Sequence, residues 1–168
     1  MFKKQRRGEM IGIIIIAAIL TACVFVYASG RKSIVPEYIE NAIKTKSAEY
    51  GLDPALVNAI IKVESNFNPR SKNPADPSYG LMQITPGLAY DYGAISSKSK
   101  NVSSYNEEII LDVYTNLDIG CKFLSKLIEK YPLDQAIQSY NVGERGYYLG
   151  RRNLDYLKKV KKYYEYYK

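Results

Sequence analysis

An uninterrupted apolar run occupies residues 11–28, and it follows directly on the cations Lys3, Lys4, Arg6 and Arg7. Its length is near the lower end of what a helix needs to cross a bilayer. Because a positively charged flank stays in the cytoplasm, everything after residue 29 is expected on the other side of the membrane. The pattern therefore predicts that residues 1–29 form an N-terminal hydrophobic transmembrane or signal helix.

Three fates of this segment fit its sequence. It is a retained signal anchor, a signal peptide cleaved after Ala28, or a lipoprotein signal in which Cys23 is lipidated. The last alternative rests on residues 20–23, Leu-Thr-Ala-Cys, which resemble a lipobox. All three predict a chain that is anchored to the cell membrane, as a single-pass protein or by lipid, or secreted, with its remaining residues outside the cytoplasm.

Beyond residue 29, apolar positions recur every three or four residues, which is the period of an amphipathic helix. We expect residues 30–49 to form a connection and a first helix, and residues 50–168 to form one further domain. Within that domain, Asp53 and Pro54 predict the start of a helix that runs to about Ser65. The prolines in residues 66–77 predict a loop.

Further helices are predicted along the rest of the chain, each from its own capping or periodic signal. The first runs from Pro86 to about Gly93, and the second starts at a capping box formed by Ser104 and Glu107. The other three cover Asn116–Tyr131, Asp134 through Tyr140, and the residues from about Asn153 onward. Gly143 and Gly146 are expected to break the helix after Tyr140. In the last helix, Leu154, Leu157, Val160 and Tyr164 share one side. Since no segment shows the alternation of a strand, the predicted fold class is all-α.

Composition narrows the chemistry that this helical domain can perform. The chain contains no histidine, which excludes Ser-His-Asp and Cys-His catalysis and ordinary His-rich zinc sites. Cys121 lies in an apolar helical pattern and is expected to be a core residue. We therefore expect neither a metal nor a cofactor, and carboxylate acid–base chemistry remains as the practicable class.

The chain carries 24 Lys and Arg against 17 Asp and Glu, a net charge of +7. Such an excess favours anionic partners such as a lipid headgroup layer or the bacterial wall, or serves solubility alone. No dense basic block occurs outside the termini, which disfavours nucleic acid as a partner.

Glu64 is the candidate for acid–base chemistry. It follows Ile60 by four residues and Val57 by seven, so it shares their inward-facing side of the helix. Burial disfavours the charged carboxylate and raises its pKa, in the direction that a general acid needs at neutral pH. The structural alternative is a partly exposed glutamate at the helix end that makes a cap or an ion pair.

Two short motifs follow Glu64 along the chain. Residues 80–84, Gly-Leu-Met-Gln-Ile, place Gln83 between apolar neighbours, and this pattern is also typical of a structural turn. Residues 139–143, Ser-Tyr-Asn-Val-Gly, supply a ring, a hydroxyl and an amide, groups that suit an N-acetylated sugar. A helix C-cap has much the same sequence, so each motif alone leaves both interpretations open.

In this order and spacing, the motifs resemble the lytic transglycosylase domain of the soluble lytic transglycosylase type, which is related to goose-type lysozyme. The resemblance covers about Tyr50 to Tyr167 and rests on residues 64–69, 79–84, 116–120 and 139–143. It implies an α-rich lysozyme-like fold that cleaves the MurNAc–GlcNAc β-1,4 bond of peptidoglycan glycan strands.

The resemblance also implies roles for individual residues. Glu64 would be the single catalytic residue, first as the acid on the leaving oxygen and then as the base on the sugar's C6 hydroxyl, whose attack on C1 leaves a 1,6-anhydro end. The sugar groove would contain Ser65, Met82, Gln83, Tyr140 and Asn141, with Tyr140 nearest to Glu64. Asp76 and Asp91 are expected in loops or exposed turns, without a catalytic role.

Two other functions compete with this hypothesis. A goose-lysozyme-like hydrolase would share the fold but use water as the nucleophile. A wall-binding component of a secretion or conjugation apparatus would share the fold without catalysis, and envelope-spanning machinery would then be its partner. An intact Glu64 within its motif argues against the second.

Overall fold

The computed structural model describes residues 35–96 and 105–168, and Pro36–Lys168 form one unit. The hydrophobic helix predicted within residues 1–29 lies outside the described residues. In the part that is described, no helix is both long and apolar enough to cross a membrane.

Helix α3 (Pro54–Glu64) lies at the centre of the fold, because almost its whole surface is apolar. Asp53 caps its start by accepting a hydrogen bond from the Ala55 backbone N–H at 2.8 Å. Val57, Ile60 and Ile61 are fully buried. Helix α2 (Glu37–Glu49) packs against α3 and against α6 (Val113–Lys130).

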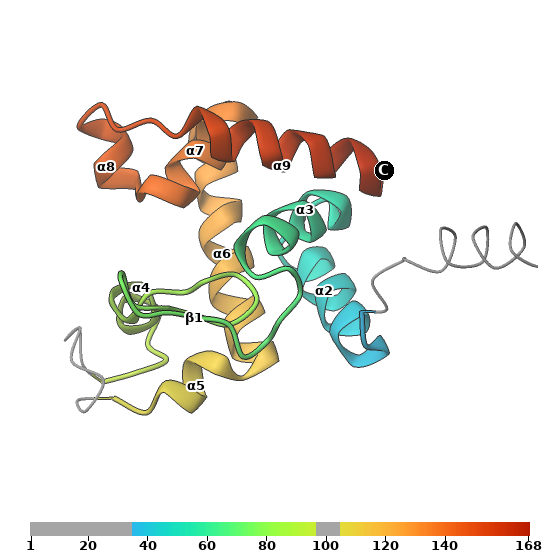
Figure 1. The fold of residues 1–168 in the computed structure, drawn as a ribbon, viewed down its shortest axis with the longest axis vertical. Helices are drawn as coiled ribbons and strands as arrows, with labels where there is room; N and C mark the ends of the chain where they lie inside the picture. The colour runs from blue at the N-terminus through green and yellow to red at the C-terminus, as the bar shows by residue number, and fades with distance from the viewer. Residues whose placement is uncertain (1–34, 97–104) are drawn as a thin grey trace, which may run out of the picture. The chain divides into compact units, whose positions relative to one another are not determined.

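On one side of α3 lies a small irregular part of the molecule (Figure 1). It contains helix α4 (Pro86–Asp91), helix α5 (Glu107–Leu111) and a hairpin of β1 (Lys72–Asn73) and β2 (Ser78–Tyr79). The strands are antiparallel, with Lys72 opposite Tyr79. The sequence gives no sign of this hairpin, because strands of two residues are too short to show an alternating pattern.

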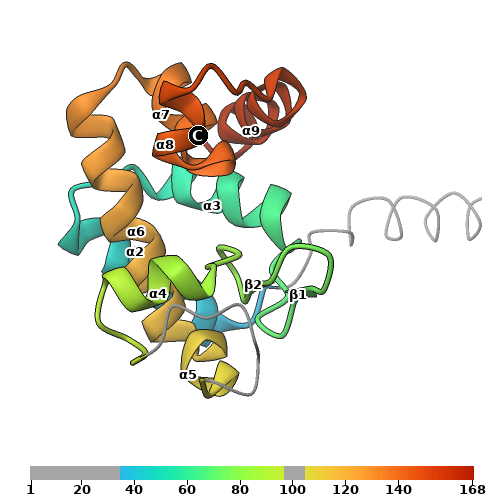
Figure 2. The same ribbon diagram turned by 90° about the vertical axis from the view of Figure 1, so that its left-hand side faces the viewer.

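On the other side of α3 lie the helices that end the chain (Figures 1 and 2). They are α7 (Leu133–Val142), α8 (Glu144–Tyr148) and α9 (Leu154–Tyr167). Helix α9 packs along α3, and α7 contacts α6, α8 and α9. Helix α6 passes between the two sides and carries the buried Cys121 that the apolar pattern predicts.

Several predicted helix ends need correction. Helix α5 is capped by Asn106, whose side chain accepts a hydrogen bond from the Glu108 N–H, and Ser104 lies outside the described residues. Helix α7 begins at Leu133 without a side-chain cap, because Asp134 lies in its first turn, where it binds Lys161. Of the two glycines predicted to break the helix, only Gly143 does so, with φ of +74° between α7 and α8. Gly146 lies inside α8.

The prediction for α9 is confirmed for the buried Val160 but is wrong for Leu154. Leu154 is 68% exposed, whereas Tyr156 and Val160 are buried against the fold. The sequence pattern misleads here because the inward positions of this helix include tyrosines, which the apolar count undervalues. The correct side matters, since it turns Tyr156 toward α3.

Candidate active site

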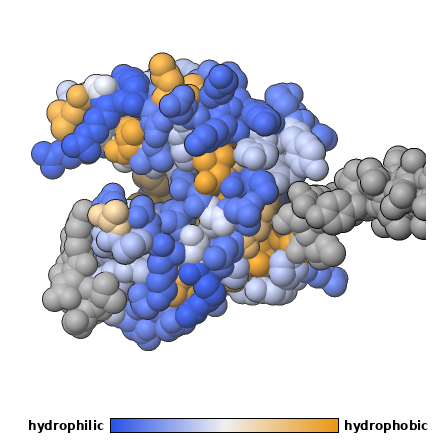
Figure 3. All heavy atoms as spheres, viewed as in Figure 1, coloured by the Kyte–Doolittle hydropathy of each residue, from blue (hydrophilic) through white to orange (hydrophobic). Residues whose placement is uncertain are grey.

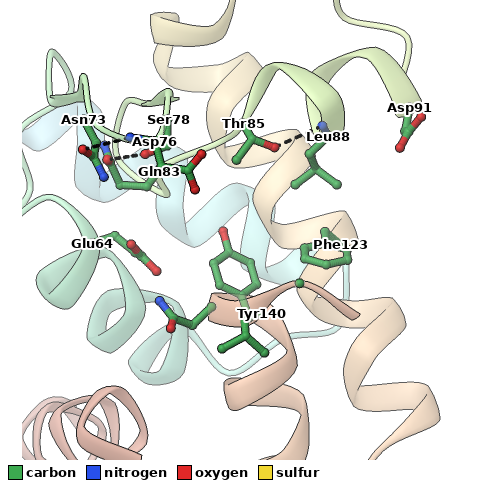
Figure 4. Close-up of a pocket in the computed structure, with 13 residues that line it drawn as sticks. Glu64, Asn73, Asp76, Ser78, Gln83, Thr85, Leu88, Asp91, Phe123 and Tyr140 are labelled. Atoms are coloured by element: carbon green, nitrogen blue, oxygen red, sulfur yellow. Dashed lines mark hydrogen bonds between the residues drawn. The ribbon is translucent and has the colours of Figure 1, made fainter. Parts of the chain in front are cut away.

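A cleft of about 510 Å³ lies where the end of α3 meets the hairpin, α4, α6 and the end of α7 (Figure 4). In Figure 3 the surface is hollowed between the two sides of the molecule. The cleft is lined by Glu64, Asn73, Asp76, Ser78, Gln83, Thr85, Leu88, Asp91, Phe123, Tyr140, Asn141, Val142 and Gly143. Three of the five predicted sugar-groove residues are therefore at the cleft: Gln83, Tyr140 and Asn141.

Glu64 is the last residue of α3 and is half-buried at the wall of the cleft. Burial raises the pKa of its carboxyl to about 7, although a hydrogen bond from the Tyr156 hydroxyl lowers that pKa in part. The hydroxyl donates to Glu64 Oε1 at 2.6 Å. Within the described residues, Glu64 forms no salt bridge, and its Oε2 accepts no hydrogen bond. A carboxyl with a pKa near 7 can both hold and release a proton around neutral pH, and Oε2 is the oxygen that Tyr156 does not contact.

Tyr156 was not among the residues that the sequence singled out. We expected Tyr140 to lie nearest to the acid, but the Tyr140 hydroxyl donates to the Met82 carbonyl at 2.9 Å. Tyr156 is buried on α9, and the Asn153 side chain caps this helix by accepting a hydrogen bond from the Tyr156 N–H. The spacing of Tyr156 and Val160 after that cap is the sequence signal that could have found it.

The chain turns sharply directly after the acid. Asn66 and Phe67 have φ of 52° and 63°, in the left-handed region that residues other than glycine rarely adopt. The Ser65 hydroxyl donates to the Leu81 carbonyl at 2.8 Å, which joins the end of α3 to the motif of residues 80–84. Ser65 does not line the cleft, where it was expected, and its hydroxyl instead holds the Leu81 carbonyl.

Asn116 holds the motif of residues 80–84 in place from helix α6. Its fully buried side chain donates to the carbonyls of Tyr79 (2.7 Å) and Ile110 (2.8 Å), and accepts from the Met82 N–H (2.8 Å). Gly80 has φ of +75°, and a Cβ there would lie 2.4 Å from Asn116 Nδ2. Glycine is therefore required both for backbone conformation and for close approach at this position.

The two predicted sugar contacts in this motif have different surroundings. Gln83 lines the cleft with φ of 49°, and its amide is held by Ser78 Oγ at 2.8 Å and the Gly80 carbonyl at 3.0 Å. Met82 is fully buried instead, and a Cβ on Gly120 would lie 2.4 Å from its sulfur. The Met82 side chain thus belongs to the core, while its backbone carbonyl binds Tyr140.

Tyr140 and Asn141 lie in the last turn of helix α7, at the cleft. The Tyr140 ring lies 5.5 Å from that of Phe123, and burial raises the pKa of its hydroxyl well above the usual value. Asn141 Oδ1 accepts a hydrogen bond from Asn153 Nδ2 at 2.8 Å, which connects the cleft to the start of α9.

Two further acids reach the cleft. Asp76 lies in the turn between β1 and β2, and Asp91 is the last residue of α4, and both line the cleft across from α3 (Figure 4). Both side chains are exposed, as expected, but Asp91 ends a helix and does not lie in the loop or turn that we predicted. The folding of these two segments over α3 could not be predicted from the sequence. Within residues 35–96 and 105–168, no group of three or more acidic or cysteine side chains is arranged to hold a metal ion.

Comparison with known proteins identifies the family of this chain and proteins that share its fold. The model of the family described as the transglycosylase SLT domain matches residues 41–163. The 70 kDa soluble lytic transglycosylase of Escherichia coli has a similar fold, with a TM-score of 0.51 and 23% identity over 76% of this chain and 22% of that one. The lytic transglycosylase Slt of Pseudomonas aeruginosa, solved as an inactive mutant, gives a TM-score of 0.50 and 20% identity over 79% and 22%.

Curated relatives are similar over about half of this chain. A membrane-bound lytic murein transglycosylase C of Photorhabdus laumondii is 34% identical over 55% of this chain and 25% of its own length. A membrane-bound lytic murein transglycosylase E of Buchnera aphidicola is 35% identical over 53% and 39%. The chain thus spans well under half of these longer relatives. Because the family model matches most of its residues, the chain belongs to the transglycosylase SLT domain family.

Proposed function

We propose that this protein is a peptidoglycan lytic transglycosylase that cleaves the MurNAc–GlcNAc β-1,4 bond and leaves a 1,6-anhydro-muramoyl end. The observation that carries the proposal is the Glu64 carboxyl, which lines the cleft with a pKa raised to about 7. Family membership supports the substrate class, since the similar relatives are named lytic murein transglycosylases.

Glu64 acts first as a general acid. The Tyr156 hydroxyl donates to Oε1, so the acidic proton is carried by Oε2, which is left to the substrate. Transfer of that proton to the glycosidic oxygen makes the departing sugar a neutral alcohol. A pKa near the working pH suits this step, because the group must hold its proton before the reaction and release it during the reaction.

The same carboxylate then acts as the base. It takes the proton of the muramoyl C6 hydroxyl, whose oxygen attacks C1 and closes the anhydro ring, and this returns Glu64 to its protonated state. Glycosidases that use water or a covalent intermediate need two carboxyl groups. An internal nucleophile removes that need, so one buried acid is sufficient here.

Gln83, Tyr140 and Asn141 are proposed to contact the glycan, since all three line the cleft beside Glu64. Ser65 and Met82 are proposed to support glycan binding indirectly. The Ser65 hydroxyl donates a hydrogen bond to the Leu81 carbonyl, and the Met82 carbonyl accepts one from the Tyr140 hydroxyl. The wall glycan would be met outside the cytoplasm, with residues 1–29 as the membrane tether or export signal. The names of these relatives, which call them membrane-bound, support this location.

A goose-lysozyme-like hydrolase is the second candidate, and one observation favours it. Asp76 and Asp91 line the same cleft as Glu64, so a second carboxylate is within the site. Either could direct a water molecule to C1, which is the arrangement of an inverting enzyme. A wall-binding protein without catalysis would have no use for a buried acid.

The products of wall digestion distinguish these functions. Purified full-length protein is incubated with peptidoglycan, and the soluble fragments are analysed by mass spectrometry. We expect muropeptides with 1,6-anhydro ends, which are lighter by one water than fragments with reducing ends. Reducing ends alone would establish the hydrolase, and wall binding without soluble fragments would establish the non-catalytic function.

A further inference from the structure

We propose that the turn between α8 and α9, together with the outward side of α9, docks onto an anionic lipid surface. We call this region the basic-apolar surface. It consists of Tyr148, Leu149, Arg151, Leu154, Lys158 and Lys162. The proposal is independent of the proposed activity, because none of these residues lines the cleft.

Three large apolar side chains of this surface project into solvent. Tyr148 is 85% exposed, Leu149 65% and Leu154 68%, and they lie within seven consecutive residues. In Figure 3, hydrophobic residues stand out on the surface of the upper part of the molecule, where α8 connects to α9. A group of exposed apolar residues bordered by polar ones is typical of an interaction site rather than of plain solubility.

Helical spacing places cations beside these apolar residues. Lys158 and Lys162 follow Leu154 by four and eight positions, so all three share one side of α9. This is the outward side, because Tyr156 and Val160 hold the opposite side against the fold. The surface is thus continuous from the turn along the helix.

The charge of the chain is concentrated in the same region. Residues 145–168 carry eight of the 24 Lys and Arg but only two of the 17 Asp and Glu, so they account for +6 of the net +7. Arg151, Lys158 and Lys162 are exposed and form no salt bridge within the described part of the chain. Their charge is therefore available to an external anionic partner.

The combination of these features favours lipid over a soluble polyanion. Cations alone would suit any polyanion, but exposed leucines gain free energy only in an apolar phase. An interfacial segment binds through buried apolar area together with attraction of its cations to anionic headgroups. Tyrosine suits the boundary itself, because its ring is apolar and its hydroxyl is polar.

A tryptophan probe tests this docking directly, because the chain has no other tryptophan. Tyr148→Trp is made in the full chain, which is mixed with vesicles of phosphatidylcholine and phosphatidylglycerol with brominated acyl chains. We expect the emission of Trp at 148 to shift to shorter wavelength and to be quenched. The matched control is Tyr114→Trp, at a position 52% exposed on α6, where neither change is expected.

Charge variants test the electrostatic part. Arg151→Gln, Lys158→Gln and Lys162→Gln combined in the Tyr148→Trp chain should abolish most of the quenching, since each lost cation weakens docking by roughly fivefold at low salt. The same number of changes at Lys44, Lys122 and Lys126, which are exposed on α2 and α6, should preserve it.

Four outcomes would overturn the proposal. One is equal quenching at positions 148 and 114. Another is quenching that changes neither with the charge of the lipid nor with the three substitutions. The third is a response of the probe to soluble polyphosphate but not to brominated lipid, which would mean a polyanion site. The fourth is an emission shift that depends on protein concentration without lipid, which would mean self-association.

Discussion

Glu64 combines burial with a position at the cleft, and this combination has a cost in stability. The pKa of its carboxyl is raised from 4.5 to about 7 by burial. A group whose folded-state pKa lies above its unfolded value favours folding less as pH rises, because the unfolded chain releases the proton first. The free energy of unfolding should therefore fall between pH 4.5 and 7, in contrast to the behaviour of a salt-bridged acid.

The variant Glu64→Gln removes this titration and keeps the shape of the side chain. We expect it to be more stable than the wild type at pH 8, by about 1–3 kcal/mol after allowance for the partial exposure of the side chain. At pH 4, where the wild-type carboxyl is protonated, the two should be equally stable. Urea unfolding at both pH values measures this, and an equal difference at the two pH values would contradict the raised pKa.

Tyr156 affects both the pKa of the Glu64 carboxyl and its orientation. Its hydroxyl lowers the Glu64 pKa, so Tyr156→Phe should raise that pKa further. The protonated acid is lost as pH rises through its pKa, and the alkaline fall of kcat/KM should therefore move to higher pH. Loss of the hydrogen bond should also cut kcat by roughly tenfold, through poorer orientation of the carboxyl.

Tyr140→Phe is the matched control for this change. The Tyr140 hydroxyl is buried at the same cleft but donates to the Met82 carbonyl, not to Glu64. It should lower stability by about 1 kcal/mol and leave the alkaline fall where it is. Equal pH shifts in the two variants would contradict the assignment of Tyr156 as the partner of the acid.

The contact between α6 and residues 80–84 holds the part of the cleft that includes Gln83 and Tyr140 in position. Gly120 allows Met82 to approach the helix, and the Met82 carbonyl in turn holds Tyr140. Gly120→Ala would put a methyl group 2.4 Å from the Met82 sulfur, so Met82 must move. We expect a loss of about 1–3 kcal/mol in stability and a lower turnover, measured by thermal unfolding and wall clearing.

Gly87→Ala provides the comparison on α4. A Cβ there has its nearest neighbour at 4.0 Å, and the backbone is not in the left-handed region. This variant should be neutral or more stable by up to about 1 kcal/mol, because alanine restricts the unfolded chain. If Gly120→Ala behaved in the same way, the contact between Gly120 and Met82 would not be tight in solution.

Helix periodicity predicted α3 and α6 well, because long apolar patterns identify buried helices. It failed where a structural feature involves only one or two residues, which is too few to show a period, as in the two-residue strands and the cap at Asn106. On α9 it placed Val160 correctly on the buried side, but it included the exposed Leu154 and omitted Tyr156, which is buried with its hydroxyl bound to Glu64. Glu64 could be found from its own helix, but its partner lies 92 positions later and only the fold brings the two together.

At the scale of the molecule, the cleft and the region of α9 differ in the charge of their side chains. The cleft is lined by Glu64, Asp76 and Asp91 and by no lysine or arginine, within the described residues. Residues 145–168, which include α9 and the turn before it, carry eight of the 24 Lys and Arg. Since α9 also carries Tyr156 on its inner side, one helix supports the acid and presents the basic-apolar surface.

The central claim is that Glu64 is the single acid and base, and turnover of purified peptidoglycan by three carboxamide variants tests it most directly. Release of anhydro-muropeptides is measured for Glu64→Gln, Asp76→Asn and Asp91→Asn beside the wild type. The account predicts a loss of at least about a thousandfold for Glu64→Gln with glycan binding retained, and less than about tenfold for the other two. Wild-type release by Glu64→Gln, or an equal loss in Asp76→Asn or Asp91→Asn, would contradict it.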